Sequence, residues 1–186
     1  YRLALQGQGR PGQREPLQRR TRGHLKKMKR KWVAAIDMGY RNMGFCVLDR
    51  TSLTKPVLLS CTDLLPNVRG TPDRRQLFHA IYDWARQNKS ILDQCDTIVL
   101  ETQKSAKFKC MNTVIMSLYP DRYHLLHPFS LCAAYQLPRT RKEKKAATIK
   151  LVNARMAEPL IGAKQDDMAD AALMALWAVE KKQHAL

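Results

Sequence analysis

Val33-Ala-Ala-Ile-Asp-Met-Gly39 is the stretch that most strongly indicates the fold, because an apolar run of β type ends in an acidic residue, Asp37. A second run of this kind, Ile98-Val-Leu-Glu-Thr-Gln103, ends in Glu101. A carboxylate at the end of a buried strand is held by the sheet and still reaches solvent. Each run alone is also compatible with an ordinary strand end, so the functional interpretation depends on what the rest of the chain adds.

A third acidic motif, Gln165-Asp-Asp-Met-Ala-Asp170, opens an apolar helix. Asp166 and Asp167 are both compatible with helix N-caps, and for Asp166 the cap is the favoured interpretation. Asp170 lies three residues after Asp167, on the same face and one turn inside the helix. An unpaired carboxylate is costly there, which favours a functional role.

Together the acidic motifs predict a metal site for chemistry on phosphates. Oxygen-only ligands suit Mg²⁺ or Mn²⁺ better than zinc. Two such ions about 4 Å apart can activate a water and neutralise the leaving oxygen of a phosphodiester. Crowded carboxylates repel one another, and bound cations supply the missing counter-charge. The candidate residues are Asp37, Glu101, Asp167 and Asp170.

The charge of the chain points to an acidic partner. Among 186 residues, 33 Lys and Arg stand against 16 Asp and Glu, giving a formal charge of +17. This excess is typical of nucleic-acid binding, although a membrane surface or another acidic partner is also compatible with it. The length and the apolar fraction of 45% fit one globular domain.

Residues 1–31 differ from the remainder, because they hold eleven Lys and Arg and a single acid, Glu15. They are compatible with a basic nucleic-acid arm, a transit peptide, or a disordered or upstream-translated leader, with Met28 as a possible native start. We expect a disordered basic leader over 1–31 and one domain over 32–183.

The cysteines and histidines give little sign of zinc. The five cysteines are odd in number, widely spaced and without a C-x-x-C pair, which favours free thiols in a reducing compartment. His124 and His127 lie three apart on a β-like run, so they face opposite sides. No apolar stretch approaches the roughly 20 residues of a membrane span.

The opening motif of Asp37 also occurs in actin-like and sugar-kinase ATPases. Those enzymes need a second domain and a glycine-rich adenosine loop, whereas Gly162 is the only glycine after Gly70. We therefore expect no nucleotide cofactor.

Hydrophobic periodicity predicts an α/β domain with a mixed five-stranded sheet flanked by helices. The expected strands are three of an antiparallel meander and two more: Trp32–Ile36, Gly44–Leu48, Val57–Cys61, Thr97–Leu100 and Tyr123–His127. A helix is expected after Thr71-Pro-Asp73, with Leu77, Ile81, Trp84 and Ala85 on its apolar face. Further helices are expected over Lys107–Leu118, after the basic run Arg139–Lys145, and over Asp166–Lys182.

The three acidic motifs, in this order and spacing, resemble the poxvirus and fungal mitochondrial branch of Holliday junction resolvases, a RuvC-like group of the RNase H-like superfamily. The resemblance covers roughly residues 32–178. It implies an endonuclease that cuts four-way DNA junctions as a homodimer, with two Mg²⁺ or Mn²⁺ ions. It further implies that Asp37, Glu101, Asp167 and Asp170 bind the metals, and that Lys145 lies near the scissile phosphate, with Lys142 and Lys144 as alternatives.

Other assignments follow from the same resemblance. The residues expected to contact DNA are Arg41, Asn42, Gln103, Lys104, Lys107, Lys109, Arg139, Arg141, Lys142 and Lys144. The helix carrying Val114, Ile115 and Leu118 is a candidate dimer surface, with core packing as the alternative. The compartment would be host cytoplasm for a viral protein and the mitochondrion for a fungal one. An RNase H-type or rRNA-processing nuclease, or an inactive nucleic-acid-binding protein, remains an alternative.

Overall fold

The structure is a computed structural model that describes residues 32–161 and 164–183. The leader expected over 1–31 lies outside these residues. Within the described part of the chain, no helix is both long and apolar enough to cross a membrane.

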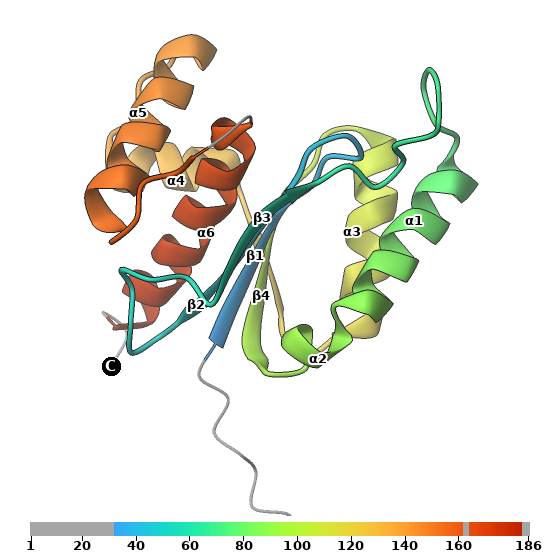
Figure 1. Cartoon of the computed structure of the whole chain (residues 1–186), viewed down its shortest axis with the longest axis horizontal. Helices are drawn as coiled ribbons and strands as arrows, with labels where there is room; N and C mark the ends of the chain where they lie inside the picture. The colour runs from blue at the N-terminus through green and yellow to red at the C-terminus, as the bar shows by residue number, and fades with distance from the viewer. Residues whose placement is uncertain (1–31, 162–163, 184–186) are drawn as a thin grey trace, which may run out of the picture.

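A five-stranded mixed sheet forms the centre of the molecule (Figure 1), in the order β3-β2-β1-β4-β5. The strands are β1 (Trp32–Asp37), β2 (Met43–Asp49), β3 (Leu58–Thr62), β4 (Cys95–Glu101) and β5 (Tyr123–Leu126). β1, β2 and β3 pair antiparallel, while β4 runs parallel to β1 and β5 runs parallel to β4. The expected sheet of three meander strands and two parallel strands is confirmed.

Helices cover both faces of this sheet (Figure 1), with α1, α2 and α3 on one side and α4, α5 and α6 on the other. The helices are α1 (Arg74–Gln87), α2 (Lys89–Leu92), α3 (Ala106–Leu118), α4 (Pro128–Tyr135), α5 (Arg141–Arg155) and α6 (Gln165–Gln183). α1 begins with a capping box, in which Asp73 accepts from the backbone N–H of Gln76 and Gln76 reaches back to Asp73.

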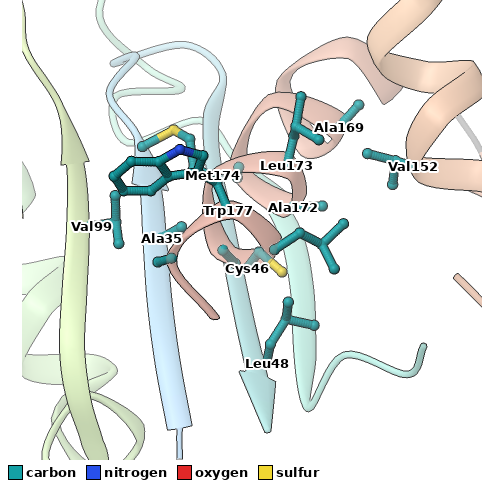
Figure 2. Close-up of a cluster of buried hydrophobic side chains, with 14 of the residues drawn as sticks. Ala35, Cys46, Leu48, Val99, Val152, Ala169, Ala172, Leu173, Met174 and Trp177 are labelled. Carbon is teal, nitrogen blue, oxygen red and sulfur yellow. The ribbon is translucent and has the colours of Figure 1, made fainter. Parts of the chain in front are cut away.

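The alternation of β1 separates two apolar cores. Val33 and Ala35 belong to the core under α6, whereas Ala34 and Ile36 belong to the core under α1 and α3. Figure 2 shows the α6 core, where helical residues such as Leu173 pack on Ala35 and on strand residues beside it. Asp37 continues the series of Val33 and Ala35, so its side chain faces α6.

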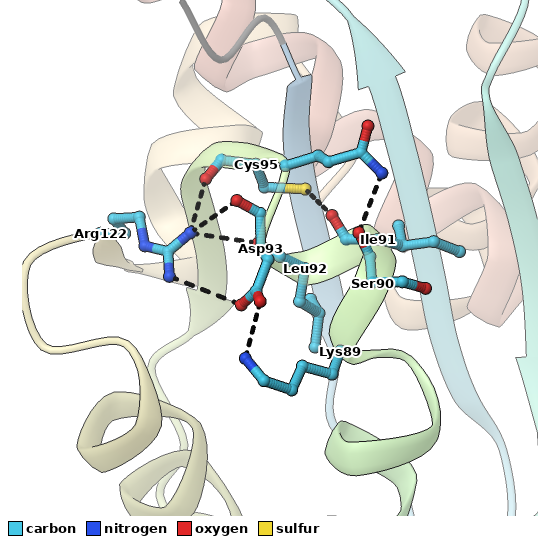
Figure 3. A network of polar contacts seen from close by, with 8 residues as sticks. Lys89, Ser90, Ile91, Leu92, Asp93, Cys95 and Arg122 are labelled. Carbon is cyan, nitrogen blue, oxygen red and sulfur yellow. Dashed lines mark hydrogen bonds and ion pairs between the residues drawn. The ribbon is translucent and has the colours of Figure 1, made fainter. Parts of the chain in front are cut away.

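Arg122 joins the start of β5 to the turn between α2 and β4 (Figure 3). Its Nη1 donates to the carbonyl oxygens of Leu92, Asp93 and Cys95 at 3.3, 3.2 and 3.1 Å. The carboxylate of Asp93 also accepts from Lys89 Nζ at 2.6 Å. These contacts fix the amino-terminal ends of β4 and β5, at the opposite edge of the sheet from Glu101.

The sequence expectations missed two short helices, α2 and α4. Pro128, which directly follows the expected fifth strand, occupies the first turn of α4, where its missing N–H costs nothing. The N-cap interpretation of Asp166 is wrong, because α6 begins at Gln165 and Asp166 lies inside its first turn. The carboxylate of Asp166 instead accepts a hydrogen bond from Lys145.

Candidate active site

The carboxyl ends of β1 and β4 bring Asp37 and Glu101 to the same edge of the sheet. The parallel register pairs Ile36 with Leu100, so the next residue of each strand lies side by side. Glu101 shares a strand face with Val99, which belongs to the α6 core. Both carboxylates therefore project from the sheet toward α6.

Gly44 brings the start of α6 onto this edge. It pairs in register with Asp37, and a Cβ added to it would lie 2.2 Å from the carbonyl oxygen of Asp167. The same Cβ would lie 3.2 Å from the Cβ of Ala171. Only a residue without a side chain permits this approach, which places Asp167 and Asp170 over the end of β1.

The four carboxylates share one electrostatic environment. Burial raises the pKa of Asp37 well above its usual range, and Asp170, Glu101 and Asp167 add to that shift in decreasing order. Burial raises the pKa of Asp170 to about 6, with a further contribution from Glu101. The pKa values of Glu101 and Asp167 are also raised, mainly by burial. Ionisation of these four carboxyl groups is therefore unfavourable unless a cation is bound.

The two adjacent lysines of α5, Lys144 and Lys145, interact with this cluster in different ways. The positive charge of Lys144 lowers the pKa values of Asp37, Glu101 and Asp170, in opposition to burial. Lys145 forms an ion pair with Asp166, and this hydrogen bond is the main cause of the lowered pKa of Asp166. Lys145 also lowers the pKa values of Asp167 and Asp170. What distinguishes the two lysines is the ion pair that Lys145 forms with Asp166.

The donor chemistry fits a hard divalent cation, because the clustered groups are carboxylates. However, within the described residues no three His, Cys, Asp or Glu side chains are already arranged to hold one ion. The backbone places Asp37, Glu101, Asp167 and Asp170 around one edge, and the carboxylates would have to turn toward an ion to bind it. Metal binding by these residues therefore remains a prediction.

Sequence reasoning missed one residue next to Glu101. Asn112 of α3 is 5% exposed, and its Nδ2 donates to the backbone carbonyl of Glu101 at 2.9 Å. Its Oδ1 is buried and has no hydrogen-bond partner among the described residues. The sequence signal that could have identified Asn112 is an asparagine at an otherwise apolar position of a helix. Gln103 also contacts Glu101, donating from Nε2 to Oε2 at 3.2 Å.

The residues expected to contact DNA fall into two groups. Arg41 is engaged within the protein, since its guanidinium donates to the carbonyl oxygens of Leu65, at 2.7 Å, and Val68. Lys107 donates to the carbonyl of Pro72 at 2.9 Å, and Asn42 accepts from Lys164. The second group is exposed, and it comprises Lys104, Lys109, Arg139, Arg141 and Lys142.

Solved structures of Holliday junction resolvases share this fold. RuvC from Thermus thermophilus, in complex with a Holliday junction substrate, superposes with a TM-score of 0.52 at 12% identity, covering 82% of this chain and 96% of that chain. The Fowlpox virus resolvase with junction DNA gives 0.59 at 18%, covering 81% and 98%. The yeast mitochondrial Holliday junction resolvase gives 0.60 at 16%, covering 81% and 80%.

The sequence matches no protein-family model and no curated protein. At identities of 12 to 18%, the structural likeness establishes the fold. For the fold, this likeness confirms the resemblance inferred from the three acidic motifs.

Proposed function

We propose that this protein is a divalent-metal-dependent endonuclease that cuts four-way DNA junctions. The observation that carries the proposal is the convergence of four carboxylates, from two parallel strands and one helix, at one edge of a resolvase-type fold. The formal charge of +17 supplies the attraction for a DNA backbone.

In this proposal Asp37, Glu101, Asp167 and Asp170 hold two Mg²⁺ or Mn²⁺ ions. Bound ions of this kind lower the pKa of a water and neutralise charge that develops on a phosphate. The contribution of the chain is to position the ligands. Asp37 and Glu101 are fixed by adjacent strands, and Asp170 projects from the first turns of a helix whose backbone contacts Gly44. Asn112 fixes the backbone of Glu101 from the opposite face of the sheet.

Lys144 is the residue that we assign to the phosphate side of the site. Its charge acts on Asp37, Glu101 and Asp170. Lys145 acts on Asp167 and Asp170, but it is already paired with Asp166. Arg139, Arg141 and Lys142 are exposed at the start of the same helix or just before it. They are positioned to contact the DNA backbone, so binding should weaken as salt concentration rises.

A homodimer suits a four-way junction, because the near-twofold symmetry of the junction requires two paired cuts. Val114 and Ile115 are buried in the core and so favour the alternative of core packing. Leu118 is 40% exposed, and with Phe78 and Tyr82 it lines a groove of about 380 Å³ between α1 and α3. We propose this groove as the dimer surface, and Leu118→Glu should convert a dimer to a monomer in sedimentation.

The function is tested by incubating the protein with four end-labelled substrates in Mg²⁺ and in Mn²⁺. These are a four-way junction, the matching linear duplex, a single strand and an RNA–DNA hybrid of the same sequence. We expect paired nicks in the junction and little cutting of the duplex. Faster cutting of the hybrid would assign an RNase H-type activity instead. Tight junction binding without cutting in either metal would indicate a nucleic-acid-binding protein.

A further inference from the structure

Phe129 presents an aromatic ring to solvent at the beginning of α4. Its side chain is 74% exposed, which is the largest exposure among the Phe, Tyr and Trp residues that the structure describes. The ring lies parallel to the imidazole of His127, with centroids 5.4 Å apart and an interplanar angle of 12°. The two rings are therefore stacked, and most of the phenyl group remains uncovered.

This ring pair is held by the start of the helix. His127 is the N-cap of α4, and its Nδ1 accepts a hydrogen bond from the backbone N–H of Phe129 at 3.3 Å. Pro128 lies between these two residues in the sequence and restricts the backbone. Leu131 is buried in the α6 core and anchors the first turn. A ring fixed in this way loses little conformational entropy when it stacks on a ligand.

The ring pair lies beside the candidate active site. Leu126, the residue before His127, pairs in register with Glu101. The backbone N–H of Thr102 donates to the carbonyl of Leu126 at 2.8 Å, which continues the pairing past the end of the strands. The imidazole of His127 is within electrostatic reach of the Glu101 carboxylate. A DNA strand at the acidic edge would thus pass next to the exposed ring.

We propose that the His127–Phe129 ring pair is a stacking platform for an unstacked nucleobase adjacent to the phosphate that is cut. The inference rests on the proposed nuclease function and deepens it. An exposed aromatic face binds a base by stacking, with little dependence on sequence, because every base has a π-face. A base can reach the ring only where the duplex is interrupted, as at a branch point. The platform would therefore favour branched DNA over linear duplex.

The test compares Phe129→Leu, which keeps an apolar side chain, with Phe129→Trp, which keeps an aromatic face. Tyr123→Leu is the matched control, because Tyr123 is also exposed, at 37%, but lies at the amino-terminal end of β5, away from Glu101. Junctions carry the fluorescent base 2-aminopurine at single positions on either side of the cut. Fluorescence on binding, the cleavage rate and sedimentation are measured for each variant.

We expect 2-aminopurine fluorescence at one position to be quenched by the wild type and by Phe129→Trp, and to be at least twofold brighter with Phe129→Leu. Junction kcat/KM should fall about 5- to 100-fold in Phe129→Leu, the range that corresponds to loss of one stacked base. Tyr123→Leu should retain wild-type quenching.

Two results would overturn the inference while leaving the nuclease function intact. One is a Phe129→Leu variant that cuts and quenches like the wild type. The other is loss of the dimer in Phe129→Leu, which would make the ring a contact between copies. A wild-type protein that cuts no junction would instead remove the proposed function, and the platform with it.

Discussion

Gly44 and Asp167 are in direct backbone contact, since a Cβ on Gly44 would lie 2.2 Å from the carbonyl oxygen of Asp167. Gly44 is also the register partner of Asp37. One residue therefore sets the distance between the strand that carries Asp37 and the helix that carries Asp167 and Asp170. The geometry of the acidic edge therefore depends on the absence of a side chain at Gly44.

Gly44→Ala should separate α6 from β2 and impair both nuclease activity and stability. Backbone shifts of this kind typically cost about 1 to 3 kcal/mol. A misplacement near 1 Å at a catalytic site can cost about a hundredfold in rate. Junction cleavage and urea unfolding of the purified variant measure the two effects.

Ala171→Gly, introduced into the Gly44→Ala variant, is the control for this clash. The Cβ of Ala171 lies 3.2 Å from the added Cβ, but the closer atoms belong to the Asp167 backbone. We therefore expect no recovery of activity in the double variant. Full recovery would show that side-chain crowding, and not the position of the α6 backbone, is responsible.

Asp170 should make the metal-free protein less stable as pH rises. Its pKa is about 6 in the folded state, against about 4 in an unfolded chain. The folded state binds more protons between these values, so the free energy of unfolding falls from about pH 4 to pH 6, by at most about 3 kcal/mol from this group. In thermal unfolding with EDTA, the stability of Asp170→Asn relative to that of the wild type should increase over that pH range.

Mg²⁺ or Mn²⁺ should reverse this loss, because a bound cation favours the ionised carboxylates. The rise in melting temperature on adding metal should be larger at pH 8 than at pH 5, and much smaller in Asp170→Asn. The raised pKa values of Asp37, Glu101 and Asp167 act in the same direction, while the lowered pKa of Asp166 opposes them. An equal gain at both pH values would argue against a metal site here.

Asn112→Leu should reduce activity about tenfold or more through Glu101, with a small change in stability. The variant removes the hydrogen bond to the Glu101 carbonyl and also removes the unpartnered Oδ1, so the two effects on stability oppose each other. The control is Thr148→Val on α5. Its Oγ1 is the other buried side-chain atom without a partner among the described residues. Thr148→Val should raise stability by about 1 kcal/mol and leave cleavage unchanged.

Lys144→Met should lose more nuclease activity than Lys145→Met. Without Lys144, the carboxylates lose a charge that favours their ionised forms, and the phosphate loses its assigned partner. Without Lys145, Asp166 loses its ion pair. We expect a larger loss of kcat in Lys144→Met, measured at saturating Mg²⁺. A larger loss in Lys145→Met would return the phosphate contact to Lys145.

The sheet and its acidic ends were predictable from the sequence because strand alternation and the acidic strand ends are local features. The apolar run ending at Asp37 and the one ending at Glu101 both became strands with those ends. The last helix was predicted from its apolar composition. The residues that determine such elements lie close together in the sequence.

Relationships between distant residues were not predictable. Periodicity could not tell Lys144 from Lys145, because their difference depends on where α5 lies against Asp166. Arg41 is an arginine in a turn, and only the folded loop shows that its guanidinium binds the carbonyls of Leu65 and Val68. The role of Gly44 likewise requires knowing that α6 crosses β2 at that residue.

Asp37→Asn tests the central claim most directly. The charges of the other three carboxylates all act on Asp37, and the amide keeps its shape while removing its charge. Wild type and variant are compared on an end-labelled four-way junction in Mg²⁺ and Mn²⁺, with metal-free unfolding as the check on folding. The account predicts paired nicks from the wild type, a loss of at least about a thousandfold in Asp37→Asn, and a metal-free stability at least equal to that of the wild type. Undiminished cutting by a folded Asp37→Asn protein would contradict it.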